Sequence, residues 1–426
     1  MFGLPDNDRA IANFTMLGHS LVHWFETSIP IFLVVWLTEF PDAGVAVFGL
    51  IVALGYAPFG LGALPAGVLT DRYGPKRLIL VCLGGMAFAF VVLAFADSIA
   101  TIALALVLWG VAASVYHPAG LALISTGVEE RPTVFAYHGI AGNVGIALGP
   151  FVTATLLMVG LEWQLVAAVL AVPGFVGLAY GLSASFDPAG AVDADDVSDA
   201  SEPLSLSEFV SGSRALFASA FAVVFAIVTF EGLFYRGILT YLPEILHDAP
   251  AMAVLDLPTG FEGIEPADYI YVGLLVVGIA GQYAGGKLTD RIRVERGLAG
   301  IFAVLAVLAV AFVPVREMGL GPIIVLCAIL GFFLFAIQPF YQEAVAVHTP
   351  EDARGLSYGY TYLGEFGLGA TSIALGGFAL GVGLEAFFGL LIGFALVGMA
   401  LSWGLLIAIS RFDAWQGPRA RAQSED

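Results

Sequence analysis

Long apolar stretches separated by short polar segments run along the whole of this 426-residue chain. A helix that crosses the hydrocarbon core of a bilayer needs about 20 predominantly apolar residues. Twelve stretches reach that length, near residues 11–38, 44–70, 78–96, 99–125, 133–158, 163–184, 214–245, 267–288, 297–315, 320–347, 355–381 and 384–410. The pattern predicts an all-α membrane protein with twelve transmembrane helices.

The pattern also repeats in the two halves of the chain. Leu69-Thr70-Asp71-Arg72 closes one apolar stretch, and Leu288-Thr289-Asp290-Arg291 closes another in the second half. Phe25-Glu26 likewise recurs as Phe230-Glu231. Parallel six-span repeats are one internal symmetry of transporters, which bind their substrate at the repeat interface near the membrane midplane. We therefore expect two pseudo-symmetric six-helix bundles.

The repeat also predicts the domain boundaries. An N-terminal bundle takes residues 1–184, and a C-terminal bundle takes residues 213–414. The segment 185–212 between them is rich in Ser, Pro and acidic residues, a composition typical of a flexible linker. Residues 415–426 form a short tail.

Basic residues predict the orientation of the chain. All Lys and Arg residues except Arg236 and Arg316 fall on one side of the twelve-span arrangement. By the positive-inside rule this side is cytoplasmic. The first stretch lacks the basic region and cleavage site of a signal peptide, so we interpret it as a retained helix. We expect a multi-pass protein of the cell membrane with both termini in the cytoplasm.

Composition supports this class and adds a hint about habitat. Charged residues make up 12% of the chain, about half of the roughly 25% found in soluble domains. The net charge is −19, and the acidic residues gather in the predicted loops. They either keep the loops soluble or indicate a halophilic protein, because acidic surfaces stay hydrated in high salt. Cys82 and Cys327 lie inside apolar stretches, which indicates no disulfide.

The loop between the second and third predicted helices resembles the signature loop of the major facilitator superfamily. Gly67 is followed after three residues by Asp71-Arg72, and then by Gly74 and two bases. Residues 286–296 resemble a degenerate second copy. The resemblance covers essentially the whole chain, and it implies alternating access by two rocking bundles around a central cavity. It implies gate motif residues Gly67, Asp71, Arg72, Gly74, Arg77, Asp290 and Arg291, of which Asp71 and Arg72 hold the cytoplasmic gate.

Three further segments resemble the fosmidomycin-resistance branch of that superfamily. They are Gly18-His19-Ser20 with His23, Tyr116-His117-Pro118, and Gly142-Asn143-Val144-Gly145 with Gly149-Pro150. The resemblance implies export of drugs in exchange for protons. Thr153-Ala154 stand where the antiporter motif of the fifth helix has glycines, so the direction of transport stays open.

Ionisable residues inside the predicted helices are candidates for coupling. An ionisable group is costly in a bilayer and marks a functional position by default. His19, His23 and Glu26 lie at i, i+4 and i+7, so they share one helical face, and Glu231 is the counterpart of Glu26. We expect proton coupling through Glu26 and Glu231, with His23 as a relay. The alternatives are hydrogen bonds to neighbouring helices or direct contact with substrate.

Other polar residues are candidates for lining the cavity. Arg236 would hold an anionic substrate, unless Glu231 or Glu343 neutralises it or it extends to the outer surface. His138 and Glu343 lie nearer the inner surface, where gate ion pairs are expected. Glu365 lies within the eleventh helix and could also belong to the gate. The predicted cavity residues are His19, His117, Asn143, Arg236, Gln338 and Glu365.

A metal site is the competing interpretation of the first helix, because His19, His23 and Glu26 could be three ligands. The chain has no HExxH motif and no His-rich loop, so we expect no metal and no cofactor. No phosphate-binding Walker loop is present, which argues against ATP-driven transport.

The sequence thus predicts a secondary transporter, not an enzyme. We expect proton-coupled export of a small organic solute or drug by alternating access. The second hypothesis is proton-coupled uptake of a small anionic metabolite, and a third is an intramembrane metal-binding protein. The expected partners are a small-molecule substrate, protons and the lipid bilayer, with no nucleic acid, and the expected state is a monomer.

Overall fold

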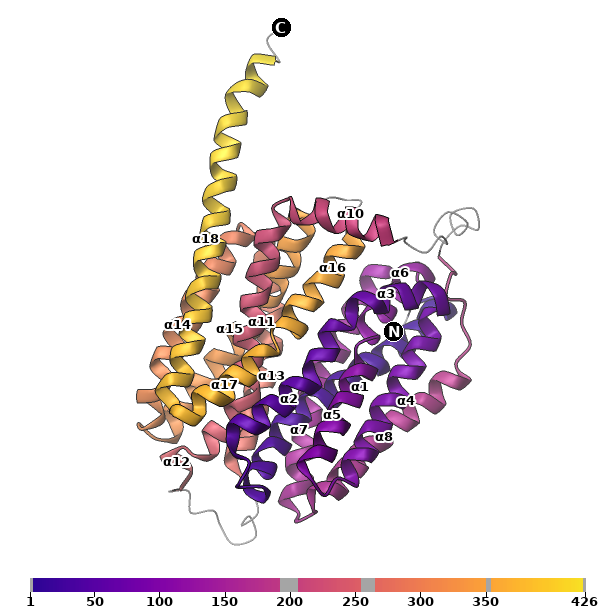
Figure 1. Ribbon diagram of the computed structural model, residues 1–426. Coiled ribbons are helices and arrows are strands. Elements are labelled where there is room, and N and C mark those ends of the chain that lie inside the picture. The colour runs from indigo at the N-terminus through magenta and orange to yellow at the C-terminus, as the bar shows by residue number, and fades with distance from the viewer. Residues whose placement is uncertain (1–2, 192–205, 254–264, 350–353, 424–426) are drawn as a thin grey trace.

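The computed structural model describes residues 3–191, 206–253, 265–349 and 354–423, the last without side chains beyond residue 409. All regular elements in these residues are helical, and twelve spans are long and apolar enough to cross a membrane. The predicted all-α fold with twelve transmembrane helices is confirmed. Figure 1 shows the two halves side by side, the first in indigo to magenta and the second in crimson through orange to yellow.

The first half contains eight helices. They are α1 (Asp6–Glu39), α2 (Gly44–Leu61), α3 (Ala63–Tyr73), α4 (Pro75–Ala94), α5 (Ile99–Ala113), α6 (Tyr116–Gly127), α7 (Arg131–Met158) and α8 (Trp163–Ser183).

The second half contains nine α-helices and one π-helical segment in the described residues. They are α10 (Leu206–Phe217), α11 (Phe221–His247), α12 (Pro250–Ala253), α13 (Pro266–Thr289), α14 (Val294–Arg316), α15 (Leu320–His348), α16 (Arg354–Tyr362), η2 (Leu363–Leu368), α17 (Thr371–Val382) and α18 (Leu384–Gln423).

Several predicted stretches are interrupted. The stretch 99–125 divides between α5 and α6, because Pro118 in the first turn of α6 has no N–H to continue the helix. The stretch 44–70 divides at Gly62, where a Cβ would lie 2.4 Å from the Ser114 side chain. The stretch 355–381 contains η2, and such π segments are frequent at functional sites.

Two predicted boundaries differ from the structure. The predicted stretch 214–245 begins too early, because Arg214 lies in the separate helix α10, and α11 starts at Phe221. Helix α18 continues to Gln423, through most of the predicted tail. In the predicted linker, residues 192–205 lie outside the described part of the chain, whereas residues 206–212 are helical.

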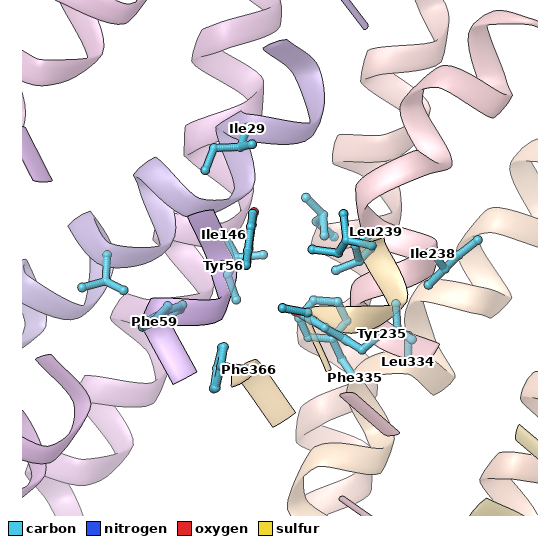
Figure 2. Packing of buried hydrophobic residues seen from close by; sticks show 14 of the residues in the cluster. Ile29, Tyr56, Phe59, Ile146, Tyr235, Ile238, Leu239, Leu334, Phe335 and Phe366 are labelled. Carbon is cyan, nitrogen blue, oxygen red and sulfur yellow. The ribbon is translucent and has the colours of Figure 1, made fainter. Parts of the chain in front are cut away.

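The two halves pack through glycine contacts between α2 and the eleventh span. A Cβ on Gly60 would lie 1.9 Å from the backbone nitrogen of Gly367 in η2. A Cβ on Gly49 would lie 2.3 Å from the Tyr241 hydroxyl and 3.0 Å from the backbone oxygen of Ile373 in α17. Figure 2 shows Phe366 beside Phe59 at this junction, and their ring centroids are 4.7 Å apart. A contact this close leaves no room for a side chain, so glycine is required.

Candidate functional site

A cavity of about 550 Å³ lies between the two halves, a size typical of small-molecule sites. Its walls come from α1, α6 and α7 of the first half and from α11, α13, α15, α16 and η2 of the second. The lining continues to Ser125, Phe135 and Tyr358, near the helix ends on the side of α10. Six predicted cavity residues line it: His19, His117, Asn143, Arg236, Gln338 and Glu365.

A buried ion pair crosses the cavity from one half to the other. Nη1 of Arg236 on α11 donates a hydrogen bond to Oε1 of Glu26 on α1. The side chains are only 5% and 3% exposed. The guanidinium also lies 4.4 Å from the ring centroid of Phe366, a cation–π contact. The residue that neutralises Arg236 is therefore Glu26, and not Glu231 or Glu343 as the sequence suggests.

Four histidines gather beside this ion pair. Nδ1 of His23 lies 2.5 Å from Oε2 of Glu26, and its Nε2 lies 3.1 Å from Nε2 of His19. Nδ1 of His19 lies 2.7 Å from the backbone oxygen of His138, whose ring stacks on His19 at 3.9 Å between centroids. His117 on α6 meets His19 edge to face at 5.3 Å. The predicted face of α1 thus carries His19 and His23, and helices α6 and α7 add His117 and His138 to the cluster.

The sequence prediction for the position of His138 is wrong. We expect it near the inner surface in a gate ion pair, yet it is buried among rings on α7. The signal that could have placed it is Gly142, one helical turn further along α7. A Cβ there would lie 2.5 Å from the His19 ring. The glycine lets α7 approach α1, which brings the two histidines together.

Two carboxyl groups lie together in the second half. Glu365 in η2 lines the cavity and accepts a hydrogen bond of 2.7 Å from the Tyr341 hydroxyl. Glu231 on α11 lies beside η2, is 2% exposed, and is not part of the cavity lining. Neither of its carboxyl oxygens has a hydrogen-bond partner among the described residues. Glu231 therefore neighbours Glu365 of its own half and is separated from the cavity.

A row of amides joins the halves at another point of the cavity wall. Nδ2 of Asn143 on α7 donates to Oε1 of Gln282 on α13 at 2.5 Å. Nε2 of Gln282 in turn donates to Oε1 of Gln338 on α15 at 3.2 Å. Gln282 is a cavity residue that the sequence interpretation does not contain. The only feature of the sequence that marks Gln282 is an uncharged amide within an apolar span. That feature alone is weak evidence for a cavity residue.

The gate motif residues lie away from the cavity. Asp71 and Arg72 are in the last turn of α3, and Gly74 follows with a φ of +82°, a conformation that favours glycine. Among the described residues, neither Asp71 nor Arg72 forms an ion pair, and neither do Asp290 and Arg291. Partial burial raises the pKa of the Asp71 carboxyl.

Curated relatives match parts of this chain. A segment of 125 residues is 32% identical to an uncharacterized MFS-type transporter YqjV of Bacillus subtilis (strain 168), covering 29% of this chain and 30% of the relative. A segment of 154 residues is 29% identical to a Na(+), Li(+), K(+)/H(+) antiporter of Planococcus maritimus, covering 34% and 36%. The matched parts span only about a third of the length of these relatives.

Solved structures match nearly the whole chain. The nucleoside transporter NupG superposes with a TM-score of 0.72 at 13% identity, covering 93% of this chain and 99% of NupG. A bacterial homolog of the human lysosomal transporter Spinster, inward-facing and unoccupied, gives 0.69 at 15% identity, covering 95% and 98%. At these identities the likeness shows the fold alone.

The profile of the Major Facilitator Superfamily matches residues 15–372, which is most of the chain. Together with the twelve spans and the transporter fold, this match excludes an enzyme as the interpretation. The chain belongs to the major facilitator superfamily and is a multi-pass membrane transporter.

Proposed function

We propose that this transporter exports a small organic solute or drug in exchange for protons, by alternating access. The observation that carries the proposal is the buried Glu231, which has no hydrogen-bond partner among the described residues and lies beside a second carboxyl, Glu365. An ionised carboxylate buried without a partner is strongly unfavourable, and such a group takes up a proton instead. Glu231 is thus a place where a proton can travel with a conformational change.

The route to that place is short. Glu365 lines the cavity and lies next to Glu231, so a proton from cavity water reaches Glu231 through one neighbouring group. Glu365 lies in the π-helical segment that packs on Gly60 of the opposite half. Protonation of the pair therefore acts on an element that must move when the halves rock.

Glu26 takes a different role in this proposal. It is the counter-ion of Arg236 and holds His23, so it holds the two halves together rather than carrying the proton. Breaking this ion pair would accompany the change to the other open state. The sequence predicts proton coupling through Glu26, Glu231 and His23. In this proposal Glu231 alone carries the coupled proton, and Glu365 is its neighbour.

The remaining assignments follow the same interpretation. We place the protein in the cell membrane with both termini in the cytoplasm, as basic residues predict, so the cavity opens to the cytoplasm in this state. We propose that Asp71 and Arg72 form ion pairs when that side closes. We also propose that the two bundles are divided by the segment 185–212 and that the protein is a monomer. We further propose that it belongs to the fosmidomycin-resistance branch and comes from a halophile. The partial match to the Na(+), Li(+), K(+)/H(+) antiporter of Planococcus maritimus supports coupling to protons.

The second candidate function is proton-coupled uptake of a small anionic metabolite. It is favoured by Arg236, which lines the cavity and whose Nε has no partner among the described residues. An anion would have to displace Glu26 from this guanidinium. Because the charge is already compensated, we rank uptake of an anion below export.

Transport by the purified protein in vesicles tests the proposal. Compounds, fosmidomycin among them, are first screened for a rise in melting temperature, since a ligand of the folded form stabilises it. The most stabilising compound then serves as the probe in vesicles with an imposed pH gradient. We expect probe movement against its gradient, with opposite proton flux. Glu231→Gln should abolish gradient-driven movement but retain exchange of labelled for unlabelled probe.

Glu317→Gln is the matched control, because Glu317 lies exposed at the end of α14. It should transport as the unaltered protein does. If Glu231→Gln still concentrates the probe under the pH gradient, the coupling assignment is wrong.

A further inference from the structure

We propose that His19, His23 and His117 bind one divalent transition-metal ion on the wall of the cavity. One ring nitrogen from each lies within 4.8 Å of the others. His19 and His23 come from one face of α1, and His117 comes from α6. Three imidazoles form a donor set that suits Zn²⁺, Co²⁺, Ni²⁺ and Cu²⁺, whereas Mg²⁺ and Ca²⁺ prefer oxygen ligands.

The hydrogen bonds fix which nitrogens are free. A carbonyl oxygen only accepts, so Nδ1 of His19 carries the proton that it donates to the backbone of His138. Nδ1 of His23 likewise donates to the Glu26 carboxylate. In the neutral imidazoles, both Nε2 atoms then present lone pairs, and these face each other at 3.1 Å. Two lone pairs so close repel unless a cation lies between them, either a proton or a metal ion.

The surroundings of the two rings are those of metal ligands. A ligating histidine usually donates its other N–H to a carboxylate or a backbone carbonyl, which orients the ring and raises its basicity. Glu26 and the carbonyl of His138 occupy these two positions. His117 makes no hydrogen bond among the described residues, so its nitrogens are available.

The distances require a small adjustment. Two nitrogens on one zinc ion, each at about 2.0–2.1 Å, lie at most about 4.2 Å apart. The 3.1 Å between His19 and His23 already meets this limit. Tetrahedral geometry brings two such nitrogens to about 3.3–3.4 Å, so the third ring must move inward by up to about 1.5 Å. His117 lines the cavity, so an ion can enter there and keep an open coordination position toward the solute.

The charge nearby allows a cation. Arg236 is the positive group on the far side of Glu26, and the carboxylate lies between it and His23. Sequence spacing suggests His19, His23 and Glu26 as the three ligands. In the structure His117 takes the third position, and Glu26 accepts a hydrogen bond from the ligand His23 instead. This site is independent of the proposed export, since metal binding needs neither a solute nor a pH gradient.

Metal titration of the full-length, tag-free protein in detergent tests the proposal. After treatment with a chelator, Co²⁺ is added and its visible absorption is followed. We expect one Co²⁺ per chain, displaced by Zn²⁺ but not by Mg²⁺. His19→Ala and His117→Ala should remove this absorption, and Glu26→Gln should weaken binding about 10- to 100-fold, as loss of an outer partner does.

His247→Ala is the matched control, because His247 pairs with Asp268 at the end of α11, outside the cavity. It should bind Co²⁺ unchanged. His117→Gln, which retains polarity and much of the volume, replaces His117→Ala if the latter does not give a monodisperse protein. If the unaltered protein binds no Co²⁺, or if the His19 and His117 variants bind it equally well, the proposal is wrong.

Discussion

Arg236 on α11 and Glu26 on α1 form a buried ion pair between the two halves of this transporter. Both side chains lie within the membrane-spanning part of the molecule, beside the cavity. Removing one member of a buried ion pair leaves an uncompensated charge, which typically costs about 3–5 kcal/mol. In the alternating access proposed above, the two halves would separate at this level, and each charge would then need another partner or water.

Neutralising one member alone should destabilise the protein more than neutralising both. We expect Arg236→Gln or Glu26→Gln to lower the free energy of unfolding by up to about 3–5 kcal/mol. The double variant carries no uncompensated charge, so it should recover most of that loss. Thermal unfolding in detergent measures the three variants against the unaltered protein. A double variant as unstable as the worse single variant would show that an uncompensated charge does not cause the loss.

The internal repeat explains why this ion pair escapes prediction from the sequence. The repeat pairs Glu26 with Glu231, and the position equivalent to Arg236 is Ile31. The pair is therefore asymmetric, and symmetry points to Glu231 on the same helix as the partner of Arg236. Only the packing of α1 against α11 shows that the nearer carboxylate comes from the other half.

The twelve spans were predictable because burial in lipid requires long apolar helices, whatever the packing. The interruptions at Gly62 and in η2 were not, since the apolar pattern continues on both sides of each. For the site, helical spacing gave the face of His19, His23 and Glu26. His138 and Gln282 depend on how α7 and α13 sit beside their neighbours, which spacing within one helix does not determine.

Arg236→Gln also separates the two candidate functions. If the protein exports a neutral or cationic solute, Glu26 already occupies Arg236, and the variant should weaken neutral and anionic ligands by similar factors. Titration calorimetry with compounds that differ only in a carboxylate gives these factors. A selective loss for anions of more than about tenfold, equal to about 1.4 kcal/mol, would favour anion uptake instead.

The glycine contact between α2 and η2 should not tolerate a side chain. A Cβ on Gly60 would lie 1.9 Å from the backbone of Gly367, and backbone cannot yield as a flexible side chain does. We expect Gly60→Ala to cost at least about 1–3 kcal/mol of stability, the usual effect of overpacking. It should also slow transport, because the halves cannot pack closely there.

Gly300→Ala is the control for that substitution. Gly300 lies within α14 with no atom within 4 Å of an added Cβ, and alanine favours a helix over glycine by about 1 kcal/mol. This variant should be as stable as the unaltered protein or more so. Equal effects of the two substitutions on the melting temperature would contradict a tight contact at Gly60.

Asp71 should matter for the transport cycle more than for the stability of this state. Burial raises the pKa of its carboxyl, and no ion pair with a described residue offsets that effect. An acid with a raised pKa in the folded protein makes the fold less stable as pH rises through that pKa. Asp71→Asn should therefore leave stability at neutral pH unchanged or slightly higher, and the small decline of stability with rising pH should become shallower.

Asp71→Asn should slow transport although it leaves the stability of this state unchanged or slightly higher. If Asp71 forms an ion pair only when the cytoplasmic side closes, Asp71→Asn removes that contact and slows the cycle while solute binding in the cavity stays intact. Vesicle flux and binding measured on the same preparation distinguish the two effects, with Asp97→Asn as the control, because Asp97 lies in the loop between α4 and α5. If Asp71→Asn transports at the unaltered rate, the cytoplasmic side closes without the Asp71 ion pair. The proposed gate role of Asp71 is then wrong.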